Sequence, residues 1–253
     1  MITIISSTKS LDFEKKLFIE EITEPIFIDE VSTLVNVLKE YTVDEIAKMM
    51  KISDKLAEVN YNRFKYFYEE NVNTRQAFFA FSGEVYKAIN PFTYREEDIK
   101  FAQDHIRILS GLFGMLRPLD KIKEYRLEMA TKIKDIPEDN LYNFWTDKIT
   151  EKLISELNNR REKIILNLAS LEYSKVINRS KLENIEVYDV EFKENREGKF
   201  KVIGTYAKRA RGLMVTYIVK NKISSIEEVK DFNEDGYKYN KELSTNNKLI
   251  FTR

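Results

Sequence analysis

The sequence predicts an α+β (mixed α/β) fold, in which residues 1–253 form a single compact domain with a mixed sheet and surrounding helices. Short apolar runs suited to buried strands occur between longer segments that have the spacing of amphipathic helices. The 7 Gly and 4 Pro form no Gly- or Pro-rich linker, so no boundary between domains is marked. Hydrophobic residues make up 43% of the chain, which is enough to fill one sizeable core.

The first third of the chain is predicted to begin with a strand and to continue with helices. Residues 2–6, ITIIS, have the pattern of a short buried strand. Apolar side chains with helical spacing then predict three helices, over residues 29–41, 42–50 and 51–70. Ser53 is the expected N-cap of the third helix. The aromatic run QAFFAF at 76–81 is interpreted as a strand rather than a helix.

Two helices and a second buried strand are predicted for the middle of the chain. A helix is expected from Tyr94 to Ser110, with acidic residues in its first turn, where the helix dipole favours them. The clearest helix covers residues 139–159, because its apolar side chains fall on one face. KIILNLAS at 163–170 has the pattern of a buried strand and leads into a helix that begins at Ser170.

The last quarter is predicted to contain two β-hairpins separated by a helix. Residues 185–194 and 198–209 alternate in side-chain character around the turn residues Asn-Arg-Glu-Gly, which is typical of a hairpin. Residues 210–223 have helical spacing. Residues 237–253 then indicate a second hairpin, which turns at Thr245-Asn246-Asn247.

The composition excludes several classes of protein. The chain has no Cys and 1 His, so a disulfide framework, thiol catalysis and most zinc or iron sites are excluded, and we predict no metal and no cofactor. Carboxylates that could bind Mg²⁺ are the one metal-ligand class left open. No apolar run approaches the roughly 20 residues needed to cross a bilayer. We therefore expect a cytoplasmic protein with no membrane partner, and a monomer is favoured.

Charge is balanced overall but segregated along the chain. The formal net charge is +0, so the protein as a whole is not attracted to nucleic acid. Residues 1–50 carry five basic and ten acidic groups, whereas residues 105–134 carry seven basic and three acidic groups. Residues 199–253 carry twelve basic and six acidic groups. This asymmetry favours an anionic partner that binds locally.

The stretch HIRILSGLFGMLRPLD at 105–120 is the most distinctive motif. Gly111 and Gly114 interrupt an apolar run, and basic residues lie on both sides. One interpretation is a plain turn in which glycine caps a helix. The other is a helix-hairpin-helix, in which backbone N–H groups and the next helix's amino end receive a DNA phosphate. The glycines lie three residues apart, whereas the usual hairpin places them two apart.

The same region carries a resemblance to a known family. HIRILSGLFGMLRPLDKIKEYRLEM resembles the central signature of the YaaA family, once catalogued as a domain of unknown function and linked to bacterial peroxide-stress resistance. Other blocks are similar in the same order along the chain: IISSTKSLDF, KISDKLAEVNYNRF, FSGEVY, NLASLEY, YAKRARGLM, GY at 236–237 and LIFTR. One departure is Ser7-Thr8, which replaces Pro-Ala of the family pattern, so the turn there is expected to be less rigid.

The resemblance implies a cytoplasmic oxidative-stress protein that limits hydrogen-peroxide damage. It also implies a basic cleft and a helix-hairpin-helix-like element, here about residues 95–130, that binds the DNA phosphate backbone largely without sequence specificity. The residues expected to contact DNA are Lys9, Arg107, Gly111, Gly114, Arg117, Arg126, Lys208, Arg209 and Arg211.

Structural roles compete with these assignments. Arg117 could pair with Glu128 or Asp120, and the basic run Lys208 to Arg211 could be an ordinary solvated surface. Whether the protein is an enzyme is uncertain, and a role without catalysis is favoured. The alternative is a glycosidase or lyase acting on a nucleobase or nucleoside, with Lys9 and Glu172 as candidate catalytic groups.

Glu172 also has a plain interpretation, as an early-turn acid after the N-cap Ser170. In the enzymatic alternative, Tyr173 would serve as a stacking platform for a nucleobase. Iron handling is a weaker idea, because imidazole and thiolate ligands are scarce.

Overall fold

The centre of the computed structural model, which describes all 253 residues, is a strip of parallel strands. In sheet order these strands are β12 (Lys248–Thr252), β9 (Glu186–Arg196), β8 (Ile164–Asn167), β1 (Ile2–Ser6) and β5 (Ile106–Ser110). In β1, Thr3 lies opposite Leu166 of β8 and Ile106 of β5. The first four residues of β1 are buried, as expected for a parallel strand covered on both faces.

Antiparallel strands extend this strip into an eight-stranded mixed sheet. β6 (Gly114–Leu116) pairs with β5, β11 (Lys238–Tyr239) pairs with β12, and β10 (Lys199–Lys201) pairs with the last residues of β9. Two small ribbons lie outside the sheet. They pair β2 (Ser10–Leu11) with β4 (Phe81–Ser82), and β3 (Thr74–Gln76) with β7 (Lys121–Lys123).

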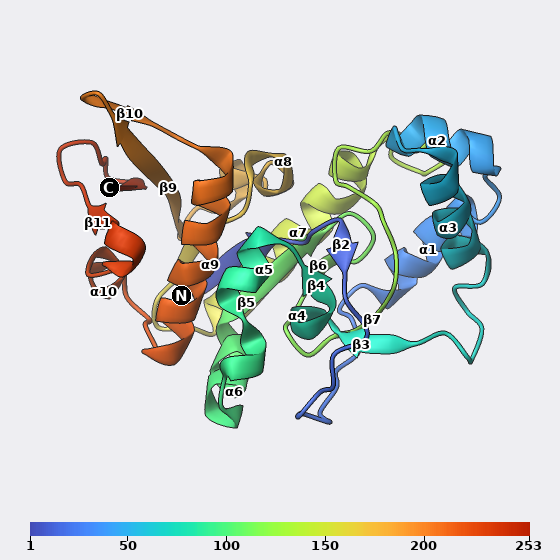
Figure 1. The fold of residues 1–253 in the computed structure, drawn as a ribbon, viewed down its shortest axis with the longest axis horizontal. Helices are drawn as coiled ribbons and strands as arrows, with labels where there is room; N and C mark the ends of the chain where they lie inside the picture. The colour runs from blue at the N-terminus through green and yellow to red at the C-terminus, as the bar shows by residue number, and fades with distance from the viewer.

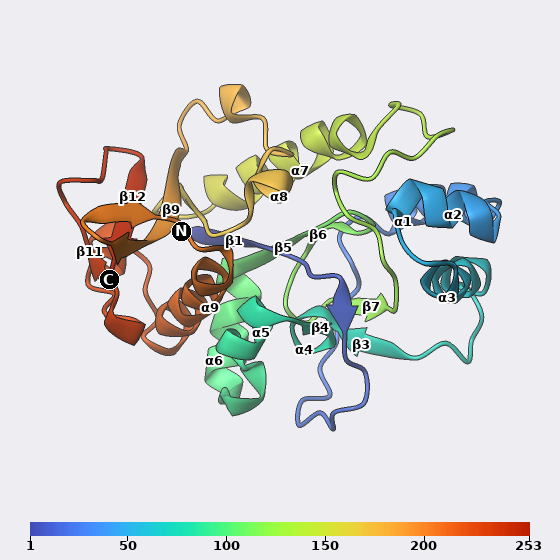
Figure 2. The same cartoon turned by 45° about the horizontal axis from the view of Figure 1, so that its top comes forward.

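Helices cover both faces of the sheet (Figures 1 and 2). Figure 2 shows α7 (Leu141–Asn158) and α8 (Leu171–Ser174) on one side of it. The opposite side carries α5 (Glu84–Ile89), α6 (Glu96–His105) and α9 (Gly204–Lys220).

The remaining helices lie at the two ends of the molecule or are short. α1 (Ile28–Leu38), α2 (Val43–Met50) and α3 (Asp54–Lys65) form a group at the end away from the C-terminus (Figure 1). The short elements are α4 (Ala77–Ala80), α10 (Ile226–Lys230) and three 3₁₀ turns at Pro91–Thr93, Arg179–Lys181 and Glu234–Gly236.

One hydrophobic core extends through the molecule. The 68 buried residues of the core form a single contiguous cluster that includes residues of the α1–α3 group as well as of the main sheet. Separate domains would each have a core of their own. The chain is therefore a single mixed α/β domain. No helix in it combines the length and the apolar character that a membrane crossing requires.

Most of the predicted elements are confirmed. The strand at 2–6, the three helices that follow and the long helix at 139–159 lie within a few residues of their expected bounds. Ser53 and Ser170 occupy the N-cap positions of α3 and α8, although neither side chain makes a capping hydrogen bond. The C-terminal hairpin also forms, with Thr245 bridged to Lys248 at its turn.

Three predictions of secondary structure are wrong in part. The helix expected from Tyr94 to Ser110 ends at His105, and the apolar residues after it form the buried strand β5. The run at 76–81 contains helix α4, because its aromatic side chains are buried on every side and show no strand alternation. The helix expected at 210–223 begins at Gly204 instead, so the second hairpin strand is only three residues long.

Candidate functional site

Polar residues gather where three neighbouring parallel strands end. β1, β5 and β8 end at Ser6, Ser110 and Asn167, and parallel strands that lie side by side present their carboxyl ends at the same edge. This edge is where open α/β sheets commonly bind ligands. The carboxyl-edge site is defined here by residues from the end of β5 and from the loops and helix at this edge: Lys9, Ser110, Tyr125, Arg126, Glu128, Glu172 and Tyr173.

Two cations of the carboxyl-edge site share one carboxylate. Lys9 Nζ lies 2.9 Å from Oε2 of Glu128, and a terminal guanidinium nitrogen of Arg126 lies 3.2 Å from Oε1 of the same residue. Lys9 keeps 58% of its side chain exposed, whereas Arg126 keeps 18%. Nε of Arg126 is buried without a hydrogen-bond partner. Glu128 was one of the two structural partners considered for Arg117 as an alternative to DNA contact, and it pairs with Arg126 instead.

Two buried tyrosines supply neutral hydroxyl groups to the site. The hydroxyls of Tyr125 and Ser110 lie 2.6 Å apart. Burial raises the pKa of Tyr125 well above its usual value. Burial also raises the pKa of Tyr173 to about 12, with a further contribution from the negative charges of Glu172 and Glu128. Both phenols therefore stay protonated at neutral pH and are able to donate a hydrogen bond.

Glu172 contacts the segment that holds Glu128. Its Oε1 accepts a hydrogen bond of 3.2 Å from the backbone N–H of Ala130. The side chain of Ser170, before the helix, does not cap it; its Oγ accepts a hydrogen bond of 3.4 Å from Oγ of Ser6, and its backbone N–H donates to the same Ser6 Oγ. Lys9 and Glu172, the two candidate catalytic residues, thus contact the same short segment, residues 128–130.

The turn after β1 is held by Thr8, at the position where the sequence departs from the family pattern. The Thr8 hydroxyl lies 2.6 Å from the carbonyl oxygen of Ser82 and 3.0 Å from that of Ser10. Ser7 is buried. Side-chain hydrogen bonds therefore provide at this turn some of the fixation that proline would supply.

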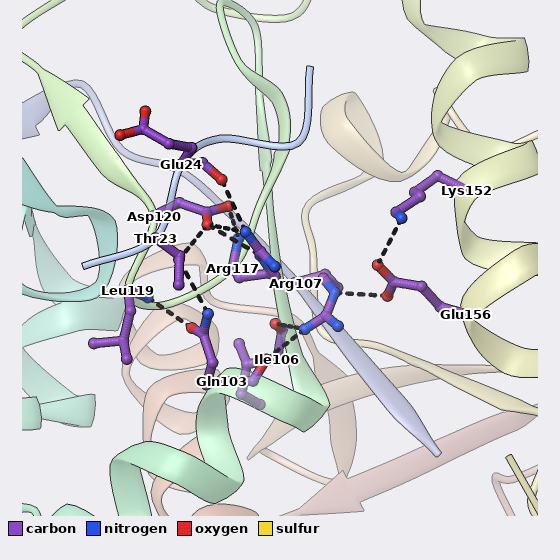
Figure 3. Close-up of polar contacts among 10 residues, drawn as sticks. All are labelled: Thr23, Glu24, Gln103, Ile106, Arg107, Arg117, Leu119, Asp120, Lys152 and Glu156. Atoms are coloured by element: carbon purple, nitrogen blue, oxygen red, sulfur yellow. Dashed lines mark hydrogen bonds and ion pairs between the residues drawn. The ribbon is translucent and has the colours of Figure 1, made fainter. Parts of the chain in front are cut away.

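Arg107 and Arg117 lie near each other but are occupied by structural contacts (Figure 3). Nε of Arg107 donates to Glu156 at 2.8 Å, and its NH1 donates to the carbonyl oxygens of Gln103 and Ile106. Arg117 pairs with Asp120 at 2.8 Å and donates to the carbonyl oxygen of Glu24. Of the two structural partners considered as alternatives to DNA contact, Arg117 thus pairs with Asp120.

Gly111 and Gly114 do not belong to a helix-hairpin-helix. The residues on either side of the turn are β5 and β6, which pair antiparallel, so the element expected at about 95–130 is a β-hairpin at this point. Both glycines are buried. A Cβ on Gly111 would lie 2.4 Å from the carbonyl oxygen of Leu127, and one on Gly114 would lie 2.6 Å from the Trp145 ring. Close packing, rather than phosphate contact, explains the two glycines.

The basic run at 208–211 lies on the first half of α9 and not between a strand and a helix. Lys208 is exposed and has no ion-pair partner, whereas Nε of Arg209 lies 3.4 Å from Asp235. Arg211 is half-buried, and its Nε has no hydrogen-bond partner. Burial lowers the pKa of Arg211, with Glu191 opposing the shift. The nine residues expected to bind DNA therefore divide into three groups: the carboxyl-edge site, the β5–β6 region and α9.

A helix pair that the sequence interpretation did not connect lies elsewhere. α2 and α3 are consecutive and are joined by only three residues, Lys51 to Ser53. Lys51 is left-handed, with φ 53° and ψ 53°. Glycine is the usual residue in this conformation. Because lysine occupies the position here, the turn lacks the glycine that would have indicated it in the sequence. The signal available was the short spacing between the two predicted helices.

Comparison with known proteins places the whole chain in one family. The model of the family described as "Peroxide stress protein YaaA" matches residues 1–243. The chain belongs to the peroxide stress protein YaaA family. A protein of Francisella philomiragia is 47% identical over 256 residues, with both chains fully covered.

Two further relatives show the same extent of similarity. A protein of Clostridium beijerinckii is 46% identical, covering all of this chain and 98% of its own length. A protein of Crocosphaera subtropica is 44% identical over the full length of both chains. All three relatives carry the description "UPF0246 protein". The resemblance inferred from the sequence blocks is thus confirmed at the level of the peroxide stress protein YaaA family.

Proposed function

We propose that this member of the peroxide stress protein YaaA family binds DNA through its phosphate backbone, largely without sequence specificity, at the turn between α2 and α3. The observation that carries the proposal is an uncapped helix end beside exposed lysines. Ser53, the N-cap of α3, makes no side-chain capping bond, so the first N–H groups of α3 lack a side-chain acceptor. Such amides, with the positive end of the helix dipole, suit a phosphate.

Three lysines surround this helix end. Lys48 lies in the last turn of α2, Lys51 lies in the connecting turn and Lys55 lies in the first turn of α3. All three are exposed, and none forms an ion pair with a carboxylate. Because phosphates position a protein without identifying a base, binding by these groups would be largely independent of DNA sequence.

The helix pair is well anchored for such a role. Ile46 and Met50 of α2 are buried, as are Ala57 and Phe64 of α3. The Thr42–Glu45 capping box fixes the start of α2. The turn between the two helices is therefore presented by a rigid support, which limits the entropy lost on binding.

The experiment is fluorescence anisotropy with a labelled short DNA duplex at low and high salt. Neutralisation of about three phosphates predicts a slope of roughly −3 for log affinity against log salt concentration. The double variant Lys48→Gln/Lys55→Gln is expected to make this slope less steep, reducing its magnitude by about 2. Lys16→Gln/Lys100→Gln, which removes two other exposed and unpaired lysines, is the matched control and should leave the slope unchanged. Absence of duplex binding at low salt, or equal losses in both double variants, would contradict the proposal.

A second candidate function is supported by the carboxyl-edge site. Catalysis on a nucleobase or nucleoside requires a general acid or base and groups that orient the substrate. Here Glu172 and Lys9 contact one short segment, residues 128–130, beside the protonated hydroxyls of Tyr125 and Tyr173. In a glycosidase or lyase, the carboxyl group of Glu172 would transfer the proton to or from the substrate.

The enzymatic candidate is tested by incubating the protein with a panel of nucleosides and following release of the free base. Glu172→Gln should abolish turnover, since the amide cannot transfer the proton, while the fold is kept. Glu58→Gln, at an exposed acidic residue of α3 that forms no ion pair, is the control. Equal turnover by Glu172→Gln and the parent protein removes Glu172 from the mechanism.

A further inference from the structure

The end of β9 extends beyond the main sheet and forms a ribbon of its own. Residues 186–193 of β9 pair with β8 or β12, whereas its last three residues, Glu194 to Arg196, pair with β10. Figure 1 shows this ribbon projecting at one end of the molecule, at the opposite end from α2 and α3. All three residues of β10 are exposed.

One face of this ribbon is basic. In the antiparallel register Lys199 lies opposite Arg196, and Lys201 lies opposite Glu194. Directly opposed residues and residues two apart share a face of a ribbon, so Arg196, Lys199 and Lys201 lie on the same face. We call these three residues, with the neighbouring Tyr206, the basic hairpin face. Lys199 and Lys201 lie about 7 Å apart along the strand.

The carboxylates next to this face are already occupied. Both oxygens of Glu194 lie 3.0 Å from Nε of Arg253, and one of them also accepts a hydrogen bond from the Tyr237 hydroxyl. Asp235 pairs with NH1 of Arg253 at 2.8 Å. Arg196, Lys199 and Lys201 therefore have no carboxylate partner, and Glu197 is the only acidic residue between residues 195 and 208.

An exposed aromatic ring adjoins the three cations. The guanidinium carbon of Arg253 lies 5.0 Å from the centre of the Tyr206 ring. Because Arg253 also binds Glu194, which faces Lys201 across the ribbon, Tyr206 lies beside the basic face. Tyr206 nevertheless keeps 39% of its surface exposed. One side of the ring is thus supported by a cation, and the remainder is open to a planar ligand.

We propose that the basic hairpin face binds single-stranded nucleic acid, with phosphates on Arg196, Lys199 and Lys201 and a base stacked on Tyr206. A basic strip beside a supported aromatic ring is the combination that single-strand binding uses. A duplex offers the same phosphates but keeps its bases stacked inside, so it leaves the ring unused. This inference rests on the proposed function in taking DNA as the partner, and it adds a second site that selects the unpaired form.

The experiment measures the affinity of the full chain for a labelled oligothymidylate and for a duplex by fluorescence anisotropy, across a range of salt concentrations. Lys199→Gln/Lys201→Gln should weaken oligothymidylate binding and reduce its salt slope by about 1.4, since each lost phosphate contact on a single strand contributes roughly 0.7. Tyr206→Leu should weaken the same binding at least about fivefold without changing the salt slope, because it removes stacking rather than charge.

Two further measurements separate this inference from the proposed function. Lys16→Gln/Lys100→Gln should bind oligothymidylate like the parent, and Lys48→Gln/Lys55→Gln should weaken duplex binding alone. If the parent binds duplex but not oligothymidylate, the inference is wrong and the proposed function stands. If Tyr206→Leu weakens duplex and oligothymidylate equally, the ring acts on the fold or on phosphates, and the stacking assignment is overturned.

Discussion

Arg107 and Glu156 form a nearly buried ion pair that ties the sheet to α7. Nε of Arg107 lies 2.8 Å from Oε2 of Glu156, and the side chains retain only 5% and 15% of their exposed surface. Burial lowers the pKa of Arg107, while Glu156 opposes the shift. A guanidinium so enclosed, with two backbone carbonyls as further acceptors, has a structural role and is not available to DNA.

Removal of Arg107 should therefore affect stability and not DNA affinity. Arg107→Ala leaves the Glu156 carboxylate largely buried without its main partner, and we expect a loss of about 3–5 kcal/mol in the free energy of unfolding. Urea denaturation measures this loss. Lys152→Ala is the control, because Lys152 lies 3.9 Å from Glu156 and is 39% exposed, so its loss should cost less than about 1 kcal/mol. Folded Arg107→Ala protein with weakened duplex binding would contradict this role.

Gly114 is required by packing and by backbone conformation. Its φ is +64°, and a Cβ there would lie 2.6 Å from two atoms of the Trp145 ring. Gly114→Ala should lower the free energy of unfolding by at least about 2 kcal/mol, because backbone strain and overpacking add. Gly198→Ala is the matched comparison: φ is +79° but nothing lies within 4 Å of the added Cβ, so only the strain of about 1 kcal/mol is expected. Equal losses in the two variants would refute the packing explanation.

The single histidine makes stability depend on pH in a defined window. His105 stacks on Phe101, with 3.9 Å between ring centres, and burial lowers the pKa of the imidazole. The unfolded chain, with a His pKa near 6.5, then binds more protons than the folded chain does. The contribution of His105 is thus fully present above about pH 6.5 and is lost as the pH falls through the folded-state value.

Thermal unfolding at several pH values tests this expectation. The parent protein should lose stability on acidification below about pH 6.5, before the carboxylates titrate. His105→Gln should show a flatter profile over the same interval. Parallel profiles of the two proteins would show that burial of the imidazole carries no such penalty.

The sequence predicted the fold well where the periodicity of apolar residues was strong and had clear ends. β1, α1 and α7 each have a single buried face or a short buried run, and their positions are confirmed. The prediction of one helix from Tyr94 to Ser110 was wrong in part because Ile106–Ser110 is buried on all sides, and a fully buried run has neither a helical nor a strand period. The helix therefore appeared to continue through what is a strand.

The candidate site was harder to predict, because ion pairs depend on which side chains are close in the fold and not on their order in the sequence. Arg117 and Asp120 were considered as a pair, since they are close in sequence, and the structure joins them. Arg107 and Glu156 are 49 residues apart, so nothing in the sequence indicated that this cation was already occupied. Lys9 and Arg126 likewise meet on Glu128 only through the arrangement of the strands.

Asp54 offers a test of the α2–α3 turn in the direction of tighter binding. It is the first residue of α3, so its carboxylate lies at the helix end where the phosphate is proposed to bind. Asp54→Asn removes this like charge, and we expect duplex affinity to rise roughly two- to fivefold, in line with charge effects of about 0.3–1 kcal/mol at helix ends. Asp44→Asn makes the same chemical change in the first turn of α2 and is the control. Since neither variant adds a cation, tighter binding by Asp54→Asn alone would locate the phosphate at the amino end of α3, and unchanged binding would place it elsewhere.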